Sequence, residues 1–200
     1  MANKNRWQKS DWVVLPISFL LIFAARSSLA DHYHVPTGSM EYSIMPGDRV
    51  LIDKTAYGLR VPFTKIKLLD GAQPQRGEVA VFDSPVDGTR LIKRIAAVGG
   101  DYVTLMNGRL SINGTRIDND NDNDNIEYFD EHSALLNLDT GGGPNIARLQ
   151  IPEGFVLVLG DHRGDSLDSR YFGLVPLDAF YGRANRVYYR RGAGISWQAL

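Results

Sequence analysis

Short apolar runs rich in β-branched residues, separated by turn residues, constrain the fold of this 200-residue chain most strongly. Three such runs have the length of strands and are bounded by Gly, Pro or Asp: residues 49–53, 78–83 and 155–159. Asn107-Gly108 and Asn113-Gly114 are two-residue hairpin signals. No long segment after Ala30 repeats its apolar residues with a helical period. The sequence therefore predicts a mainly β fold with many turns.

Composition excludes several classes of protein. With 44% hydrophobic and 22% charged residues, the chain can bury a sizeable core. It has no cysteine, which excludes disulfides, cysteine catalysis and thiolate metal sites. The net charge of −1, with acidic and basic residues interspersed, gives no reason to expect nucleic acid as a partner. A metal site is not expected either, because His-Glu-x-x-His is absent and His32-x-His34 is a poor ligand pair alone.

The amino terminus predicts a membrane anchor. Three basic residues precede an apolar run over 12–25, which favours an amino terminus in the cytoplasm. Extending the run to Ala30 gives the roughly 20 residues that a spanning helix needs, if Arg26 reaches the membrane interface. The competing interpretation is a cleaved signal peptide, because Ser28-Leu29-Ala30 is a small-x-small cleavage site. We expect an anchor over 12–30.

Ser39 is the candidate nucleophile. A serine after glycine is usually a turn residue, but this one follows the predicted anchor by nine residues, close to the bilayer surface. Gly38 lets the backbone bend tightly and lets a substrate approach. The Thr37 hydroxyl could join the Ser39 amide in stabilising an oxyanion.

Lys93 is the candidate base for Ser39. In an alternating strand, Leu91, Lys93 and Ile95 share one face, while Ile92 and Arg94 share the other. A lysine of pKa about 10.4 is less than about 0.1% neutral at pH 7, and burial can lower that pKa by about 3–5 units. The two large apolar neighbours of Lys93 are consistent with such burial, which would make the amine a useful base.

A third segment, residues 160–176, is dense in glycine, aspartate, serine and arginine. Ser166 could hold Lys93 by a hydrogen bond, and Asp168 and Arg170 are close enough in sequence to pair and brace the loop. A Ser-His-Asp triad is the rival arrangement, but the chain has no Gly-x-Ser-x-Gly elbow to seat its nucleophile. We therefore interpret the four histidines as surface or structural groups: His32, His34, His132 and His162.

The stretch from 100 to 150 is the expected insertion. Residues 118–125 alternate Asp and Asn, which is typical of a solvated polar loop and lacks the glycine and distant glutamate of a calcium loop. The predicted organisation has five parts: a cytoplasmic amino terminus (1–11), a transmembrane anchor (12–30), a first part of a catalytic β domain (31–99), an inserted β subdomain (100–150) and a second part of the catalytic domain (151–200).

Together the three catalytic segments resemble the bacterial type I signal peptidases. The family's Pro-Ser/Thr-Gly-Ser-Met segment matches residues 36–40, its Lys-Arg pair matches Lys93-Arg94, and its Gly-Asp-Asn-Arg and Ser-x-Asp-Ser-Arg elements map onto residues 160–173. Two further elements of the family resemble residues 47–52 and 76–82. The chain departs from the family at Tyr42-Ser43, where Pro-Thr is usual, and at His162, where asparagine is usual.

The resemblance implies a signal-peptidase-like β fold with an amino-terminal transmembrane helix and a small inserted β subdomain. It implies a membrane-bound serine endopeptidase without a cofactor, in which Ser39 attacks the substrate and Lys93 is the general base. Thr37 and the Ser39 amide would hold the oxyanion, Ser166 would orient Lys93, and Asp168 and Arg170 would support the site.

The implied partners are the signal peptides of exported preproteins and membrane lipid, and the implied location is the bacterial inner membrane, with the catalytic domain outside. Two alternatives stay open. One is a specialised peptidase of the same superfamily that processes pilin in conjugation. The other is a non-enzymatic envelope protein that uses the fold for binding.

Overall fold

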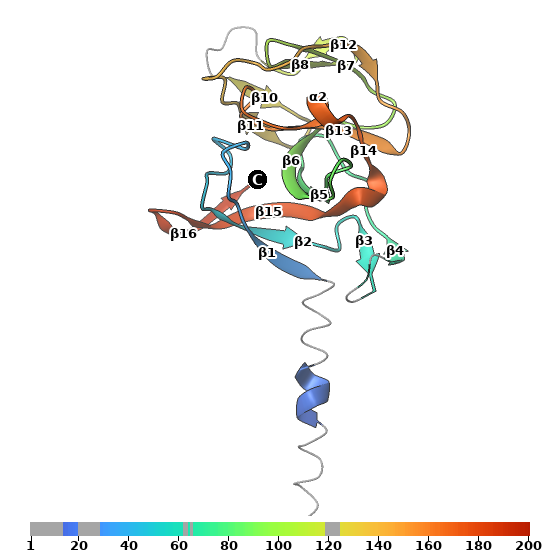
Figure 1. Cartoon of the computed structure of the whole chain (residues 1–200), viewed down its shortest axis with the longest axis vertical. Helices are drawn as coiled ribbons and strands as arrows, with labels where there is room; N and C mark the ends of the chain where they lie inside the picture. The colour runs from blue at the N-terminus through green and yellow to red at the C-terminus, as the bar shows by residue number, and fades with distance from the viewer. Residues whose placement is uncertain (1–13, 20–28, 62–63, 65, 119–124) are drawn as a thin grey trace, which may run out of the picture.

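An eight-stranded antiparallel sheet forms the centre of the molecule in the computed structural model, which describes residues 14–19, 29–61, 64, 66–118 and 125–200 (Figure 1). The strand order is β1-β2-β15-β5-β6-β13-β14, and β16 pairs with the far end of β15. The bounds are β1 Ala30–His34, β2 Arg49–Asp53, β5 Val79–Asp83, β6 Arg90–Ala97, β13 Phe155–Leu159, β14 Val175–Pro176, β15 Phe180–Arg190 and β16 Gly194–Ala199.

Smaller sheets lie between these strands in sequence. A four-stranded sheet has the order β12-β7-β8-β9, and two hairpins are formed by β10 with β11 and by β3 with β4. The bounds are β3 Gly58–Arg60, β4 Lys67–Asp70, β7 Tyr102–Met106, β8 Arg109–Ile112, β9 Thr115–Arg116, β10 Ile126–Tyr128, β11 Ser133–Leu135 and β12 Ile146–Gln150. A short helix, α2 (Ser169–Phe172), and a 3-10 turn, η1 (Leu177–Ala179), complete the described elements.

The prediction of a mainly β fold is confirmed, and the strongest local signals identified their elements closely. The runs 49–53 and 155–159 are β2 and β13 with those same bounds, and the run 78–83 contains β5. Asn107 and Gly108 adopt φ of 52° and 81°, the left-handed pair that a tight hairpin turn needs, and they join β7 to β8. Asn113 and Gly114, with φ of 53° and 85°, join β8 to β9.

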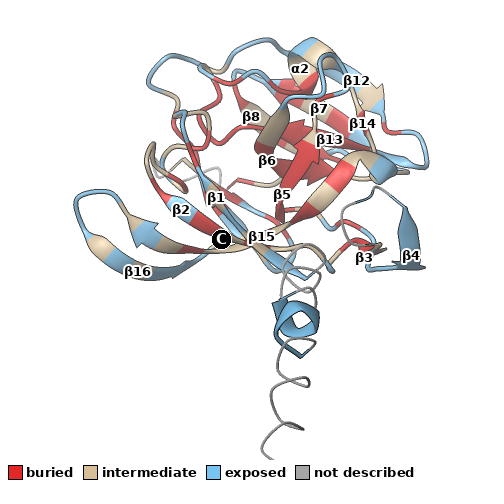
Figure 2. Ribbon diagram, turned by 60° about the horizontal axis from the view of Figure 1, so that its bottom comes forward, coloured by how far each residue is buried: buried red, intermediate tan, exposed pale blue. Residues whose placement is uncertain are grey.

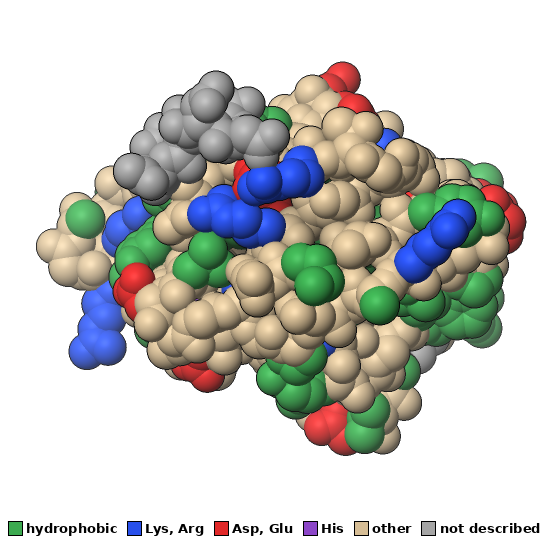
Figure 3. Space-filling model, turned by 90° about the horizontal axis from the view of Figure 1, so that it is seen from above, with side chains coloured by type: hydrophobic (Ala, Val, Ile, Leu, Met, Phe, Trp, Pro, Cys, Tyr) green, Lys and Arg blue, Asp and Glu red, His purple; other side chains and the backbone are tan. Residues whose placement is uncertain are grey.

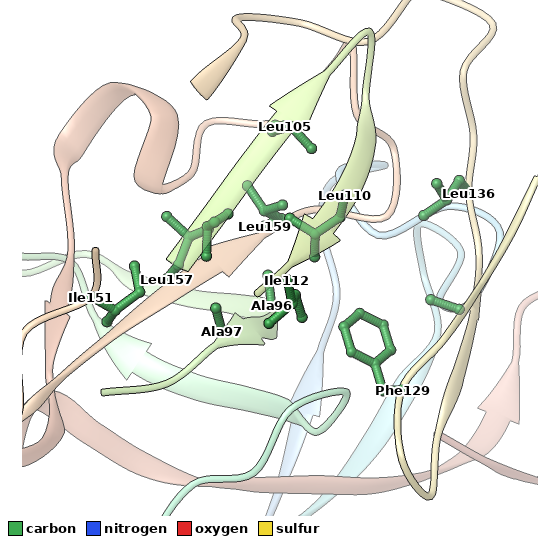
Figure 4. Close-up of a cluster of buried hydrophobic side chains, with 12 residues drawn as sticks. Ala96, Ala97, Leu105, Leu110, Ile112, Phe129, Leu136, Ile151, Leu157 and Leu159 are labelled. Carbon is green, nitrogen blue, oxygen red and sulfur yellow. The ribbon is translucent and has the colours of Figure 1, made fainter. Parts of the chain in front are cut away.

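Three clusters of buried side chains hold the sheets together. Two of them lie against the main sheet. The first includes Met40, Ile44 and Ile92, and the second includes Phe82 and Phe180. The third joins β6 and β13 to the four-stranded sheet and the loops around it (Figure 4). Strands β5, β6 and β13 are accordingly the most completely buried part of the molecule (Figure 2). Side chains from both faces of strand β6, which carries Lys93, are therefore packed in buried clusters.

The predicted cytoplasmic terminus (1–11) lies outside the described residues, as do most of the predicted anchor (12–30) and the Asp/Asn run at 119–124. Residues 14–19 are helical and exposed. Within the described ranges, no helix combines the length and apolar character that crossing a bilayer requires. The helical residues lie beyond the start of β1, at one end of the molecule (Figure 1). The opposite end mixes basic, acidic and apolar side chains (Figure 3).

Candidate active site

Ser39 and Lys93, which are 54 residues apart in sequence, meet at the centre of the site: Lys93 Nζ and Ser39 Oγ are hydrogen-bonded. Lys93 lies in β6, between Leu91 and Ile95 on one face of the strand. Ser39 lies in the loop between β1 and β2, directly before the fully buried Met40. Because Met40 and Ile44 pack into the core, the turn that carries Ser39 is fixed against the sheet.

Burial controls the chemistry of Lys93. Lys93 is 3% exposed, and this burial lowers the pKa of its amine from 10.5 to about 8. Asp168 and Asp161 oppose the shift because their negative charges favour the ammonium form. With a pKa near 8, about a tenth of the amine is neutral at pH 7. Lys93 can therefore accept a proton under physiological conditions, which an exposed lysine cannot do.

Backbone contacts fix residues 37–41, called here the nucleophile turn because they carry the predicted nucleophile Ser39, to the loop after β13. The Ser39 carbonyl accepts a hydrogen bond of 3.2 Å from the His162 amide, and the Glu41 amide donates to the Gly38 carbonyl at 3.0 Å. Thr37 is exposed at the start of this turn, two residues before Ser39. The predicted oxyanion donors, Thr37 and the Ser39 amide, thus belong to one short turn, and this turn is exposed to solvent at Thr37.

Asp168 and Arg170 form a buried brace behind the site. Arg170 donates through Nε and Nη2 to the two carboxylate oxygens of Asp168, at 2.7 Å each, and both side chains are fully buried. Asp168 also accepts from the Gly160 amide at 2.9 Å, while Arg170 donates to the Gly142 carbonyl at 2.7 Å. The brace therefore connects the end of β13, the start of α2 and the loop before β12.

Ser166 lies beside Ser39, but its predicted hydrogen bond to Lys93 is not formed. The Ser166 hydroxyl is buried, and among the described residues it has no hydrogen-bond partner. A Cβ at Gly160 would lie 2.1 Å from Ser166 Oγ and 2.4 Å from the Ser39 carbonyl oxygen, so both groups adjoin Gly160. The structure thus brings Ser166 to the edge of the site, where its hydroxyl is available to a further partner.

The sequence reasoning missed a buried ion pair next to the site. Arg94 donates to both carboxylate oxygens of Asp161, at 2.9 and 2.7 Å, and their side chains are 2% and 1% exposed. Arg94 also donates to the Gly77 carbonyl at 2.6 Å and to Ser43 Oγ at 3.1 Å. An arginine at a core position of a strand needs a buried partner, so the sequence indicates that Arg94 has one but not that it is Asp161. The pair connects β6, the loop after β13 and the nucleophile turn.

The histidines do not form a triad. Among the described residues, no histidine side chain contacts Ser39 Oγ; the ring of His162 instead faces Glu41 and Thr140. His32 and His34 are exposed on β1, and His132 lies in the loop before β11. The described ranges also contain no group of three histidine, aspartate or glutamate residues arranged to bind a metal ion.

Comparison with known proteins gives one consistent result. A family model described as "Signal peptidase, peptidase S26" matches residues 8–189. A signal peptidase I from Buchnera aphidicola is 29% identical, with 93% of this chain and 76% of that protein covered. One from Pseudomonas fluorescens is also 29% identical, with 86% and 69% covered. A solved signal peptidase I from Enterococcus faecalis shares 32% identity over 56% of this chain and 97% of its own, with a TM-score of 0.40, too low for an argument about fold.

Proposed function

This chain belongs to the signal peptidases of peptidase family S26, and from that premise we propose that Ser39 is its nucleophile and Lys93 its general base. It is a serine endopeptidase that removes signal peptides from preproteins. One observation carries the assignment of the residues: the amine of a buried lysine is hydrogen-bonded to the hydroxyl of Ser39. No other lysine of the described residues is buried.

The proposed reaction begins when neutral Lys93 takes the proton of Ser39 Oγ as that oxygen attacks the scissile carbonyl. The Ser39 amide and the Thr37 hydroxyl stabilise the negative charge on the carbonyl oxygen. The Lys93 ammonium then gives its proton to the leaving amine, which departs with the mature protein and leaves an acyl-enzyme. Lys93, neutral again, takes a proton from a water that attacks the ester carbonyl, and it returns this proton to Ser39 Oγ as the C–Oγ bond breaks and the signal peptide leaves with a new carboxylate.

Strand β6 offers the substrate an edge. Residues 90–94 pair with β5 on one side, whereas the ladder to β13 stops at Arg94. In the described structure, the second edge of residues 90–93 therefore has no partner strand. An extended peptide that pairs with this edge would run past Lys93, and backbone pairing of this kind binds peptides with little regard to sequence. We propose that the cleavage region of the preprotein adds here as a strand.

We propose that residues 12–30 anchor the enzyme in the inner membrane with the catalytic domain on the outer side. The basic residues before this segment favour that orientation. Residues 14–19 are helical, and Ser39 follows the end of β1 by five residues. This short connection would keep the active site near the lipid, where the signal peptide of an exported preprotein is held.

Alanine substitutions test the catalytic pair in a preprotein cleavage assay with the purified full-length enzyme. Ser39→Ala and Lys93→Ala should each abolish cleavage while the proteins keep the circular dichroism spectrum of the parent. Lys67→Ala is the matched control, since Lys67 is exposed on β4, and it should cleave normally. Robust processing by the Lys93→Ala variant would remove Lys93 from the mechanism.

The range of substrates separates the general enzyme from the specialised one. A general signal peptidase should cut most members of a panel of unrelated exported preproteins, each after a small-x-small motif. A peptidase dedicated to pilin should leave nearly all of them uncut. A non-enzymatic binding protein should cut none, although it could still bind them.

A further inference from the structure

The ring of His162 is buried beside the nucleophile turn, and one of its nitrogens has no hydrogen-bond partner. The side chain is 9% exposed. Its Nε2 lies 3.1 Å from Thr140 Oγ1, while Nδ1 is buried and makes no hydrogen bond among the described residues. Nδ1 faces Glu41 Oε2 at 3.6 Å, which is within ion-pair range. The chemistry proposed for Ser39 does not use this ring, so its burial calls for another explanation.

Glu41 carries the contact from His162 to the nucleophile. Glu41 is two residues after Ser39, and its carboxylate folds back over the turn: Oε1 lies 2.6 Å from the point that a Cβ at Gly38 would occupy. Its other oxygen faces His162 and is 3.5 Å from Asn137 Nδ2. The Glu41 carboxylate therefore rests between the Gly38-Ser39 backbone and two groups from other parts of the chain.

The same histidine is tied to Ser39 through its backbone. The His162 amide donates to the Ser39 carbonyl at 3.2 Å, and the adjacent Asp161 is held by the buried pair with Arg94. One residue thus contacts the nucleophile turn twice, once through the backbone at Ser39 and once through the ring at Glu41. Two contacts, at Ser39 and at Glu41, restrict how the turn can rotate, and so where Ser39 Oγ points.

We propose that His162 is a positioning residue for Ser39, and that it acts through the contact between its Nδ1 and the Glu41 carboxylate. With a proton on Nδ1 the neutral ring points its N–H toward the Glu41 carboxylate and accepts at Nε2 from the Thr140 hydroxyl. At 3.6 Å the contact with Glu41 is longer than a hydrogen bond, and it is the attraction between the N–H dipole and the carboxylate charge, at a ring that is 9% exposed. The pair keeps Ser39 Oγ within reach of Lys93. This inference rests on the proposed nucleophile and base.

Two substitutions at His162 test the contributions of its two ring nitrogens separately. The amide nitrogen of asparagine stands near the place of Nδ1, whereas that of glutamine stands near the place of Nε2. His162→Asn should therefore keep the contact to Glu41 and retain kcat within about 3-fold, and His162→Gln should lose it. We expect His162→Gln to lower kcat for preprotein cleavage by about 10- to 100-fold, because small displacements of reacting groups have effects of that size. KM should stay within about 2-fold, since no substrate contact is removed.

Glu41→Met provides an independent arm in the same full-length enzyme, because methionine keeps the length of the side chain without an oxygen that can accept from His162 Nδ1. It should lower kcat as His162→Gln does, and the double variant should be no slower than either single one, because both remove the same contact. His34→Gln, on an exposed position of β1, is the matched control and should cleave normally. The thermal midpoint of every variant is measured alongside, so that a kcat loss is compared among folded proteins.

The inference is overturned if His162→Gln and Glu41→Met both cleave at the parental rate, if their losses multiply in the double variant, or if His162→Asn is as slow as His162→Gln. Should His162→Gln not fold, Glu41→Met alone decides, since the Glu41 side chain is partly exposed and methionine keeps its length. Failure of the proposed function gives a different result, in which the parent enzyme itself does not cleave or Ser39→Ala still does.

Discussion

Lys93 must lie in apolar surroundings to work as a base, and those surroundings oppose its charge. Burial lowers the pKa of the Lys93 amine to about 8, so below that pH the folded protein holds a charged group that would be better hydrated in the unfolded chain. The difference from the ordinary value of 10.5 corresponds to about 3 kcal/mol of lost stability. Catalysis and stability therefore make opposite demands on this residue.

Lys93→Met should consequently stabilise the fold while abolishing cleavage. The penalty of the buried ammonium is fully present below pH 8, declines between pH 8 and 10.5 as the folded protein loses the proton first, and is absent above that range. In urea unfolding at pH 7 the variant should be more stable by up to about 3 kcal/mol, and the gain should shrink at pH 10.

Lys67→Met is the control for this measurement, because Lys67 is exposed and its loss should change stability little at either pH. A Lys93→Met variant that is less stable than the parent at pH 7 would show that the ammonium of Lys93 is well accommodated, contrary to this account.

Much of the site at the scale of residues could be predicted from the sequence. The alternation around Lys93 indicates its face, and Leu91 and Ile95 do pack in the same cluster. The pairing of Asp168 with Arg170 follows from their spacing. The contacts of Glu41 with His162 and of Arg94 with Asp161 join segments 121 and 67 residues apart, and no local pattern encodes such pairings. The hydrogen bond expected from Ser166 to Lys93 would likewise join distant segments, and it is not formed in this structure.

At the scale of elements, strands with a dense β-branched core and clear turn residues were predictable, and others were not. Strand β15 escaped prediction because its glycine and arginines interrupt the pattern, yet it pairs with β2, β5 and β16. Phe and Tyr at its start and Val and Tyr near its end favour a strand, but the polar stretch 182–186 separates them, and tertiary pairing makes the strand continuous. The short helix α2 is likewise specified by its cap, since the Asp168 side chain accepts from the Arg170 amide.

The close approach of the β13 loop to the nucleophile turn depends on Gly160. An added Cβ there would lie 2.4 Å from the Ser39 carbonyl oxygen, which belongs to the backbone and cannot turn away, and 2.1 Å from Ser166 Oγ. Gly160→Ala should therefore push the two segments apart and lower preprotein cleavage by at least about 100-fold, as a displacement near 1 Å can do.

The double variant Gly160→Ala with Ser166→Gly distinguishes the two clashes. It relieves the contacts with Ser166 Oγ and Cβ, which would lie 2.1 and 2.5 Å from the added Cβ, but not the one with the Ser39 backbone, so it should remain as slow as Gly160→Ala. Recovery of parental activity in the double variant would mean that the nucleophile turn does not need this close approach.

At the scale of the whole molecule, the strands from 102 to 150 form sheets of their own and yet contribute to the site. Tyr42, after the nucleophile, forms a bridge with Leu136 and donates to Asp139 at 3.0 Å. Arg163 makes a buried ion pair with Glu127. This part of the chain therefore contacts the segment after Ser39 and the loop after β13. Runs of polar loop residues predicted an insertion here, but the sequence did not indicate which residues outside this stretch it contacts.

The fate of the amino-terminal segment tests the proposed membrane anchor. If residues 12–30 are a retained anchor, the protein isolated from membranes should begin at Met1 or Ala2 and should resist extraction by alkaline carbonate. Amino-terminal sequencing of the mature protein measures this directly. A mature chain that begins at Asp31 would mean that the segment is a cleaved signal peptide, and the catalytic domain would then have no anchor from this region.

The central claim is that neutral Lys93 activates Ser39, and the pH dependence of Ser39 acylation tests it most directly. A small serine-reactive acylating reagent is reacted with the full-length enzyme from pH 6 to 9, and the adduct is located by mass spectrometry. We expect a single adduct at Ser39, with a rate constant that rises about 100-fold over this range and levels off above pH 8, as the amine loses its proton. Lys93→Ala should react slowly at every pH. A rate constant independent of pH, or equal labelling of the Lys93→Ala variant, would contradict the account.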